Sequence, residues 1–109
     1  MTQPTIQPTI DPEIPQRLYA DLGADIARRL LESFAEEALS RTDAVIAAAE
    51  AGKPTDLRSA AHALRSVSLE YGAVELANMA GAIEGGGPAD PAALRSCCET
   101  SVAALKEAR

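Results

Sequence analysis

The 109-residue chain has no tryptophan, one phenylalanine, two tyrosines, one histidine and two cysteines. With aromatic residues at 3% and alanine supplying much of the 47% apolar content, the composition suits closely packed helices better than a sheet sandwich. Valine, isoleucine and threonine are too scattered for alternating strands, and no Asn-Gly or Asp-Gly pair marks a hairpin. We therefore expect an all-α protein with one domain, since the length leaves no room for a second core.

Basic charge and long apolar runs are also scarce. The formal net charge is −6, which disfavours nucleic acid as a partner because a phosphate backbone needs a basic face. No apolar run approaches the roughly 18 residues of a membrane span, and residues 1–10 lack the basic and apolar regions of an export signal. We therefore expect a cytoplasmic monomer that binds neither nucleic acid nor membrane.

The few metal-binding and redox-active side chains exclude further classes of site. No metal site is expected, because the chain has one histidine and no CxxC spacing. The neighbouring Cys97 and Cys98 are poorly placed for a disulfide with each other and are expected to be reduced thiols. Cys98 falls on the apolar stripe of the last predicted helix, whereas Cys97 lies beside it and leaves a redox-sensing role open.

Proline and glycine divide the chain into segments. Residues 1–10 are polar and without periodicity, so we expect a disordered tail before a helical domain at residues 11–109. Asp11 and Pro12 suit the start of a short helix that ends near Gly23. The longest helix is expected from about residue 25 to residue 51. Its apolar residues recur at spacings of three and four: Ile26, Leu30, Leu31, Phe34, Ala38, Val45, Ile46 and Ala49.

Three further helices are expected after it. Thr55 or Asp56 is a candidate cap for a helix that ends at Gly72, and the run AVELANMAGAIE then forms a shorter one. The break at residues 85–88 follows, and Asp90 with the proline after it starts the last helix. Four amphipathic helices joined by short turns pack most simply as an antiparallel up-down four-helix bundle, here with an additional short N-terminal helix.

The only histidine lies in the segment AHALRSVSLEYGA. On a helix, one arc of this region is apolar and faces the core: Leu57, Ala60, Ala61, Leu64, Val67, Ser68 and Tyr71. His62 projects from the opposite side, with Arg58 and Ser66 one turn away on either side and Arg65 beside it. The two arginines favour an anion, such as a phosphoryl group, at the imidazole.

An outward imidazole with a free lone pair is a suitable nucleophile for phosphoryl transfer. In-line attack needs access from outside the helix, and the small Ser66 keeps that approach open. Leu69, two turns after His62, is also outward and is a candidate contact for an apolar surface of a partner. Glu70 and Glu84 are expected on a solvated face and receive no role.

This segment resembles the signature of histidine-containing phosphotransfer (HPt) domains of two-component phosphorelays, often written HxLKGSSxxxGxxxLxxxCxxLE. The positions that match it are His62, Leu64, the basic Arg65, Ser68, Gly72, Leu76 and the pair Ile83-Glu84. The positions that depart from it are Arg65 for lysine, Ser66 for a glycine that lets a partner approach, Val67 for the first serine and Ala80 for cysteine. The preceding LLESFAEEALSRTDAVIAAAEAG resembles the second helix of the family.

The resemblance implies a phosphorelay intermediate. His62 would accept a phosphoryl group from a receiver-domain aspartate or a histidine kinase, including a hybrid kinase, and pass it to an aspartate of a response-regulator receiver domain. Arg65 would assist at the reacting group, and Arg58, Ser66 and Leu69 would contact the partner. The residues with a structural role would be Leu64, Ser68, Gly72 and Leu76.

No Walker A loop or glycine-rich kinase loop occurs, so we expect a phosphocarrier without autonomous kinase or phosphatase activity. It would need no cofactor of its own, and Mg²⁺ would be bound by the partner receiver domain. Two other functions remain open: a helical adaptor that binds receivers or kinases without transfer, and a plain interaction bundle in which His62 is incidental. An independent hydrolase is least favoured, because no carboxylate or hydroxyl around His62 is identifiable as part of a triad.

Overall fold

The structure, a computed structural model, describes residues 9–108. Its elements are the helices α1 (Glu13–Leu22), α2 (Ala24–Glu50), α3 (Pro54–Tyr71), α4 (Val74–Glu84) and α5 (Pro91–Glu107). No strand occurs among residues 9–108, so the all-α prediction is confirmed. In the same part of the chain, no helix has the length and apolar content needed to cross a membrane.

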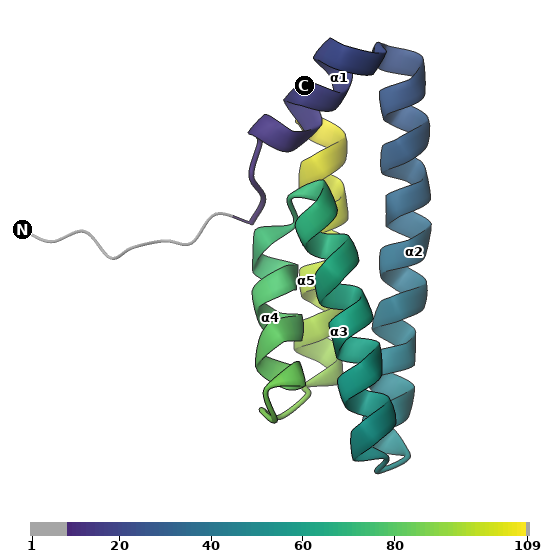
Figure 1. Cartoon of the computed structure of the whole chain (residues 1–109), viewed down its shortest axis with the longest axis vertical. Helices are drawn as coiled ribbons and strands as arrows, with labels where there is room; N and C mark the ends of the chain where they lie inside the picture. The colour runs from purple at the N-terminus through teal and green to yellow at the C-terminus, as the bar shows by residue number, and fades with distance from the viewer. Residues whose placement is uncertain (1–8, 109) are drawn as a thin grey trace, which may run out of the picture.

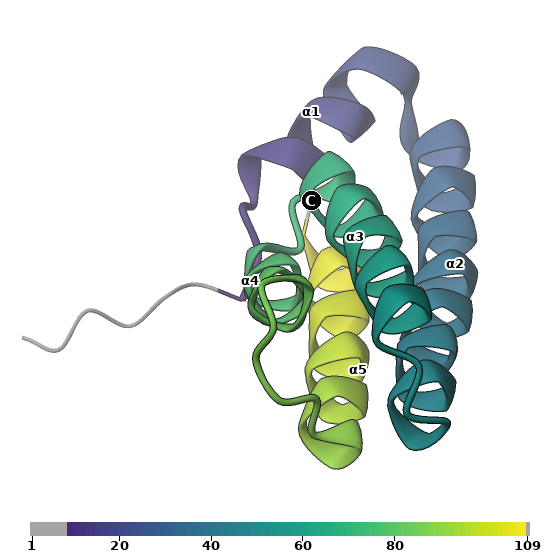
Figure 2. The same cartoon turned by 60° about the horizontal axis from the view of Figure 1, so that its bottom comes forward.

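Helices α2 to α5 lie side by side, and α1 lies across one end of them (Figures 1 and 2). Helix α3 packs against both α2 and α4, and α5 packs against α2 and α4 from the other side. Helix α1 packs on α2, with Pro15 as its buried residue. Helix α3 is therefore held along two sides, and its remaining side faces outward.

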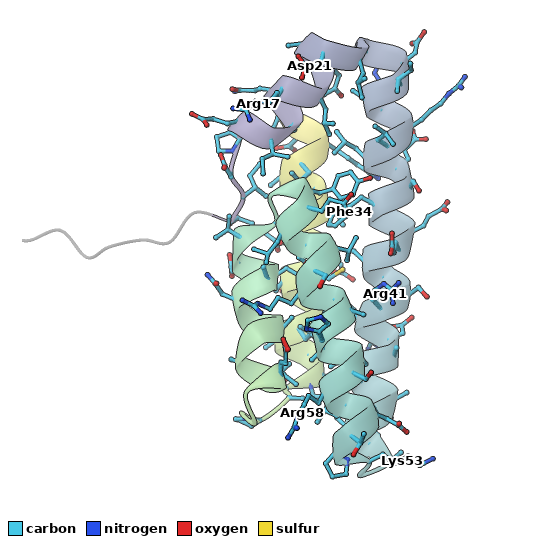
Figure 3. All side chains as sticks on the ribbon, viewed as in Figure 1. Arg17, Asp21, Phe34, Arg41, Lys53 and Arg58 are labelled. Carbon is cyan, nitrogen blue, oxygen red and sulfur yellow. The ribbon has the colours of Figure 1, made fainter. Side chains whose placement is uncertain are left out.

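The core lies between these helices. Its largest fully buried apolar side chains include Phe34, Leu64, Leu76, Leu94 and Leu105, so each of α2 to α5 contributes. Phe34 lies on the inner side of α2, where its ring centroid is 4.9 Å from that of Tyr71 on α3 (Figure 3). Burying a side chain of this size stabilises the fold by roughly 1.5–3 kcal/mol.

The apolar stripe of α2 is narrower at its start than the spacing predicts. Ile26 is 51% exposed, and the buried residue at this level is the neighbouring Ala27. The two differ by about 100° around the helix, so only one of them faces the core. The expectation that Ile26 belongs to the apolar stripe is therefore wrong.

Two of the predicted helix starts are shifted. Helix α3 begins at Pro54, and Lys53 is its N-cap without a side-chain hydrogen bond, so neither Thr55 nor Asp56 is the cap. Proline is tolerated at this first position because its missing N–H has no partner there. Helix α1 begins at Glu13, whose N–H donates to Asp11 Oδ1 at 3.1 Å.

The last helix starts as its sequence predicts. Asp90 is the N-cap of α5, and its Oδ1 accepts a hydrogen bond from Ala93 N at 3.2 Å. Pro91 occupies the first turn.

The N-terminal segment is attached to the turn between α3 and α4. Asp11 N donates to the carbonyl of Gly72 at 2.8 Å, and the carbonyl of Thr9 accepts from Glu75 N at 3.2 Å. Ile10 packs against the core. Residues 9 and 10 therefore lie against the helical domain, and the rest of the expected tail, residues 1–8, lies outside the described residues.

Gly72 ends α3 as the sequence predicts. Its φ of 80° is left-handed, and the following Ala73 N donates to Ser68 O at 2.8 Å, which closes the last turn. A Cβ at this position would lie 3.1 Å from both Asp11 O and Ile14 Cδ1. The turn thus needs glycine both for its backbone conformation and for space.

Gly72→Ala should lower the free energy of unfolding by about 2 kcal/mol, because it adds backbone strain and a clash with the N-terminal segment. Urea denaturation followed by circular dichroism measures the change.

Gly52→Ala is the matched control for this substitution. Gly52 also has a positive φ, 65°, but a Cβ there would meet nothing within 4 Å, so it should lose only about 1 kcal/mol. Equal losses for the two variants would contradict the role given to the contacts with Asp11 and Ile14.

Candidate functional site

His62 lies in the middle of α3, on the side that faces away from the core. Its side chain is 64% exposed, whereas Ala61 and Leu64 beside it are 0% exposed. The outward direction predicted from helix geometry is therefore the one observed. The imidazole is accessible to a second protein.

The imidazole is oriented by a carboxylate from the next helix. His62 Nδ1 donates to Glu84 Oε2 at 2.8 Å. A carboxylate only accepts hydrogen bonds, so in the neutral ring the proton is on Nδ1 and the lone pair is on Nε2. The two ring nitrogens lie on opposite edges, and Nε2 therefore points away from Glu84.

The sequence interpretation left Glu84 on a solvated face without a role, and the structure corrects this. Its side chain is only 24% exposed, and its Oε1 is buried without a hydrogen-bond partner. The only signal in the sequence was the pair Ile83-Glu84, at the place of the Leu-Glu pair in the HPt signature. Nothing in the local pattern of α4 shows that this carboxylate reaches a ring 22 residues earlier.

Glu84 reaches His62 because α4 packs closely on α3. The side of α4 that meets α3 carries the small residue Ala77, which is 2% exposed and lines a depression together with Arg58 and Arg65 of α3. The distance between packed helices depends on the side chains at their contact, so small residues bring the backbones together. The turn at Gly72 sends α4 back along α3, and the last residue of α4 then lies beside the ring.

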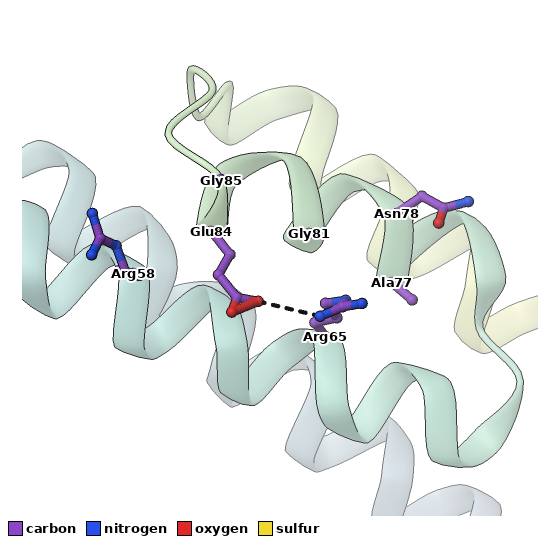
Figure 4. A pocket seen from close by; sticks show the side chains of 7 residues that line it. All are labelled: Arg58, Arg65, Ala77, Asn78, Gly81, Glu84 and Gly85. Carbon is purple, nitrogen blue, oxygen red and sulfur yellow. Dashed lines mark ion pairs between the residues drawn. The ribbon is translucent and has the colours of Figure 1, made fainter.

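The two arginines lie on the same face of α3 but differ in their contacts. Together with residues of α4 they line a shallow depression of about 720 Å³ (Figure 4). Arg65 Nη1 is 3.7 Å from Glu84 Oε1. Arg58 forms no ion pair with any residue between 9 and 108.

The other predicted site residues fall into two groups. Ser66 is exposed, and Leu69 is exposed at 52%, on the same face of α3 as His62. The residues expected to have a structural role are buried: Leu64, Ser68, Gly72 and Leu76.

Both cysteines are buried in α5, with Cys97 6% and Cys98 0% exposed. Burial raises the pKa of the Cys97 thiol to about 11, although a hydrogen bond with Ser101 acts in the opposite direction. Burial also raises the pKa of Cys98. The thiolate is the reactive form, so this environment disfavours the redox-sensing role that the sequence left open for Cys97. Between residues 9 and 108, no three His, Cys, Asp or Glu side chains gather in a group that could hold a metal ion.

Comparison with known proteins identifies one family. The family model described as the Hpt domain matches residues 29–108, which includes the whole of α3, α4 and the turn between them. No curated protein and no solved structure matches the chain.

The two cysteines should resist alkylation in the folded protein. With a pKa of about 11 for Cys97, about one thiol in a thousand is ionised at pH 8, and the rate should rise with pH up to that value. Iodoacetamide labelling read by mass spectrometry at pH 8 should give no adduct in the time that labels both residues in urea. Rapid labelling of Cys97 without denaturant would contradict this.

Proposed function

Because the chain belongs to the Hpt domain family, we propose that it carries phosphoryl groups in a phosphorelay, with His62 as the phosphorylated residue. One observation carries the choice of residue: the exposed imidazole of His62 is held at Nδ1 by Glu84, which leaves Nε2 as the nucleophile. Helical geometry alone supports an outward ring, and the carboxylate supports one particular nitrogen as the reacting atom.

In the proposed step the lone pair of Nε2 attacks the phosphorus of an aspartyl phosphate on a receiver domain. The bond between phosphorus and the aspartate oxygen breaks, the aspartate leaves as a carboxylate, and a bond between phosphorus and Nε2 forms. No proton has to leave the ring, since Nδ1 carries the only one. The ring becomes positively charged, and Glu84 Oε2, 2.8 Å from Nδ1, stabilises that charge. The reverse attack by a second aspartate restores the neutral ring.

The family implies the partners. A receiver domain or a histidine kinase supplies the phosphoryl group, and the receiver of a response regulator takes it. This chain would supply the nucleophile, two arginines and a docking surface, and would have no kinase or phosphatase activity of its own. Mg²⁺ would be bound by the receiver domain. We further propose that the protein works as a monomer in the cytoplasm.

The docking surface would extend from His62 towards the end of the molecule that α1 covers. Three of the four large apolar side chains most exposed in residues 9–108 are placed at this end: Leu22, Ile26 and Leu69. Leu22 lines a depression between α1 and α3 with Glu70, the neighbour of Leu69. An apolar surface next to an exposed nucleophile suits a receiver domain that must bring its aspartate to Nε2.

We also propose that α2 to α5 form the antiparallel four-helix bundle that the sequence predicts. The support is the order of contacts: each helix packs on its neighbours in the chain, and α5 returns to α2. A closed ring of four helices joined by short turns has this contact order. Nuclear Overhauser contacts that are more numerous between α2 and α5 than between α2 and α4 would support it, and the reverse order would contradict it.

His62→Gln should abolish phosphorylation. Incubation with a receiver domain charged with acetyl phosphate should label the wild-type protein with one acid-labile, base-stable phosphate, and ³¹P–¹⁵N spectra should place it on Nε2. The variant should stay unlabelled and keep its circular dichroism spectrum, since the ring is exposed.

Ser59→Ala is the matched control, because it removes an exposed hydroxyl from the same helix at a residue with no proposed role, and it should keep the label. A label that persists in His62→Gln would sink the proposal. Tight binding of receivers with no labelling of the wild-type protein would favour the non-catalytic adaptor instead.

Leu69→Ala should weaken docking of the receiver domain about tenfold, as expected for the loss of a buried apolar contact. Titration with a receiver domain, by calorimetry or by the concentration dependence of transfer, measures this.

Leu39→Ala is the matched control for docking. Leu39 is also an exposed leucine, at 43%, but it lies on the side where α2 meets α5. Its replacement should leave affinity unchanged, and equal effects of the two substitutions would contradict the proposed surface.

A further inference from the structure

The guanidinium of Arg65 reaches α4 instead of standing free above α3. Its side chain lies between the two helices, with Nη1 3.7 Å from Glu84 Oε1 (Figure 4). The sequence interpretation gave Arg65 a part at the reacting group. Its contact is instead with the carboxylate that orients the nucleophile.

The place that Arg65 occupies on α4 is open because residue 81 has no long side chain. A Cβ built on Gly81 would lie 3.4 Å from Cδ and from Nε of Arg65, which is ordinary van der Waals contact, and outside the backbone of its own helix it would meet no other atom within 4 Å. Gly81 weakens α4 by about 1 kcal/mol relative to alanine, and no positive φ requires glycine there. A small residue at position 81 leaves the space that Arg65 fills.

Glu84 needs a second partner besides His62. Its Oε2 accepts the hydrogen bond from Nδ1, but Oε1 is buried and has no hydrogen bond. A buried carboxylate oxygen without compensation is costly. The positive charge of Arg65 is the nearest compensation that the structure provides for it.

We propose that Arg65 is a positioning residue: it is seated on Gly81 and holds Glu84 against Nδ1 of His62, so that it acts through the carboxylate. Arg58 is then the guanidinium that meets the phosphoryl group, since it lies one turn from His62 and forms no ion pair within residues 9–108. This inference rests on the proposed phosphotransfer at His62.

A double-mutant cycle separates the two arginines. Arg65→Ala and Glu84→Ala should each slow transfer from a phosphorylated receiver domain about tenfold. The double variant should be no slower than Glu84→Ala alone. Arg58→Ala should slow transfer by the same factor in the wild-type and in the Glu84→Ala background. Independent effects of Arg65→Ala and Glu84→Ala, about a hundredfold together, would overturn the proposal.

The ring itself provides a readout that does not depend on transfer. Long-range ¹H–¹⁵N spectra of the unphosphorylated protein report which nitrogen of His62 carries the proton. Arg65→Ala and Glu84→Ala should each move the ring towards a mixture of tautomers, whereas Arg58→Ala should not. An unchanged tautomer in Arg65→Ala would overturn the proposal. Absence of a phosphate label in the wild-type protein would instead count against phosphotransfer, and not against the contacts among Arg65, Glu84 and His62.

Substitutions of Gly81 test whether its surface is where the side chain of Arg65 packs. Gly81→Leu should displace Arg65 and slow transfer as Arg65→Ala does, with no further loss when the two are combined. Gly81→Ala is the control, because a methyl group 3.4 Å from Arg65 is in van der Waals contact and should leave transfer near the wild-type rate. Both changes favour the helix, so the free energy of unfolding should not fall. Two results would contradict the proposed contact of Arg65 with Gly81. One is a wild-type rate of transfer in Gly81→Leu, and the other is a further loss of rate when Gly81→Leu is added to Arg65→Ala.

Discussion

The close packing of α4 on α3 is the contact on which the site depends. A hydrogen bond of 2.8 Å between His62 and Glu84 joins two helices, so its length is set by the separation of their backbones. Buried Ala77, which lines the depression between the two helices, keeps that separation small. A larger side chain at this position would fill the interface and carry Glu84 away from the ring. Residues that never touch the imidazole therefore determine which of its nitrogens is exposed for reaction.

Much of the fold could be predicted because the helices carry their own signals. The apolar spacing predicts the body of α2, and Gly72 and the break at residues 85–88 mark the ends of α3 and α4. The direction of His62 was also predictable, since a helix places it opposite a continuous apolar arc. These properties are local, and each depends on residues within about four positions.

The partnership of His62 with Glu84 could not be predicted in the same way. The two residues are 22 positions apart and on different helices, so their contact depends on the turn at Gly72 and on how α4 crosses α3. The direction of Arg65 has the same cause, because a long side chain adopts the rotamer that its neighbours leave open, and here Gly81 leaves the opening. The exposure of Ile26 was also not predictable from spacing, since Ile26 and the adjacent Ala27 are both apolar and only one of them can face the core at this level of the helix.

In the proposed transfer, the carboxylate of Glu84 is an electrostatic problem as well as an advantage. It would stabilise the positive ring of the phosphorylated state, yet it would repel the phosphoryl group that must arrive first. Two unit charges about 6 Å apart near a protein surface interact by roughly 3 kcal/mol, so the repulsion is not negligible. Arg65, paired with Glu84, offsets that charge where it arises, and Arg58 adds a positive charge that no described side chain neutralises. With a neutral ring the group of His62, Glu84, Arg65 and Arg58 is net positive, although the whole chain carries −6, and this local positive charge would favour an anion at His62.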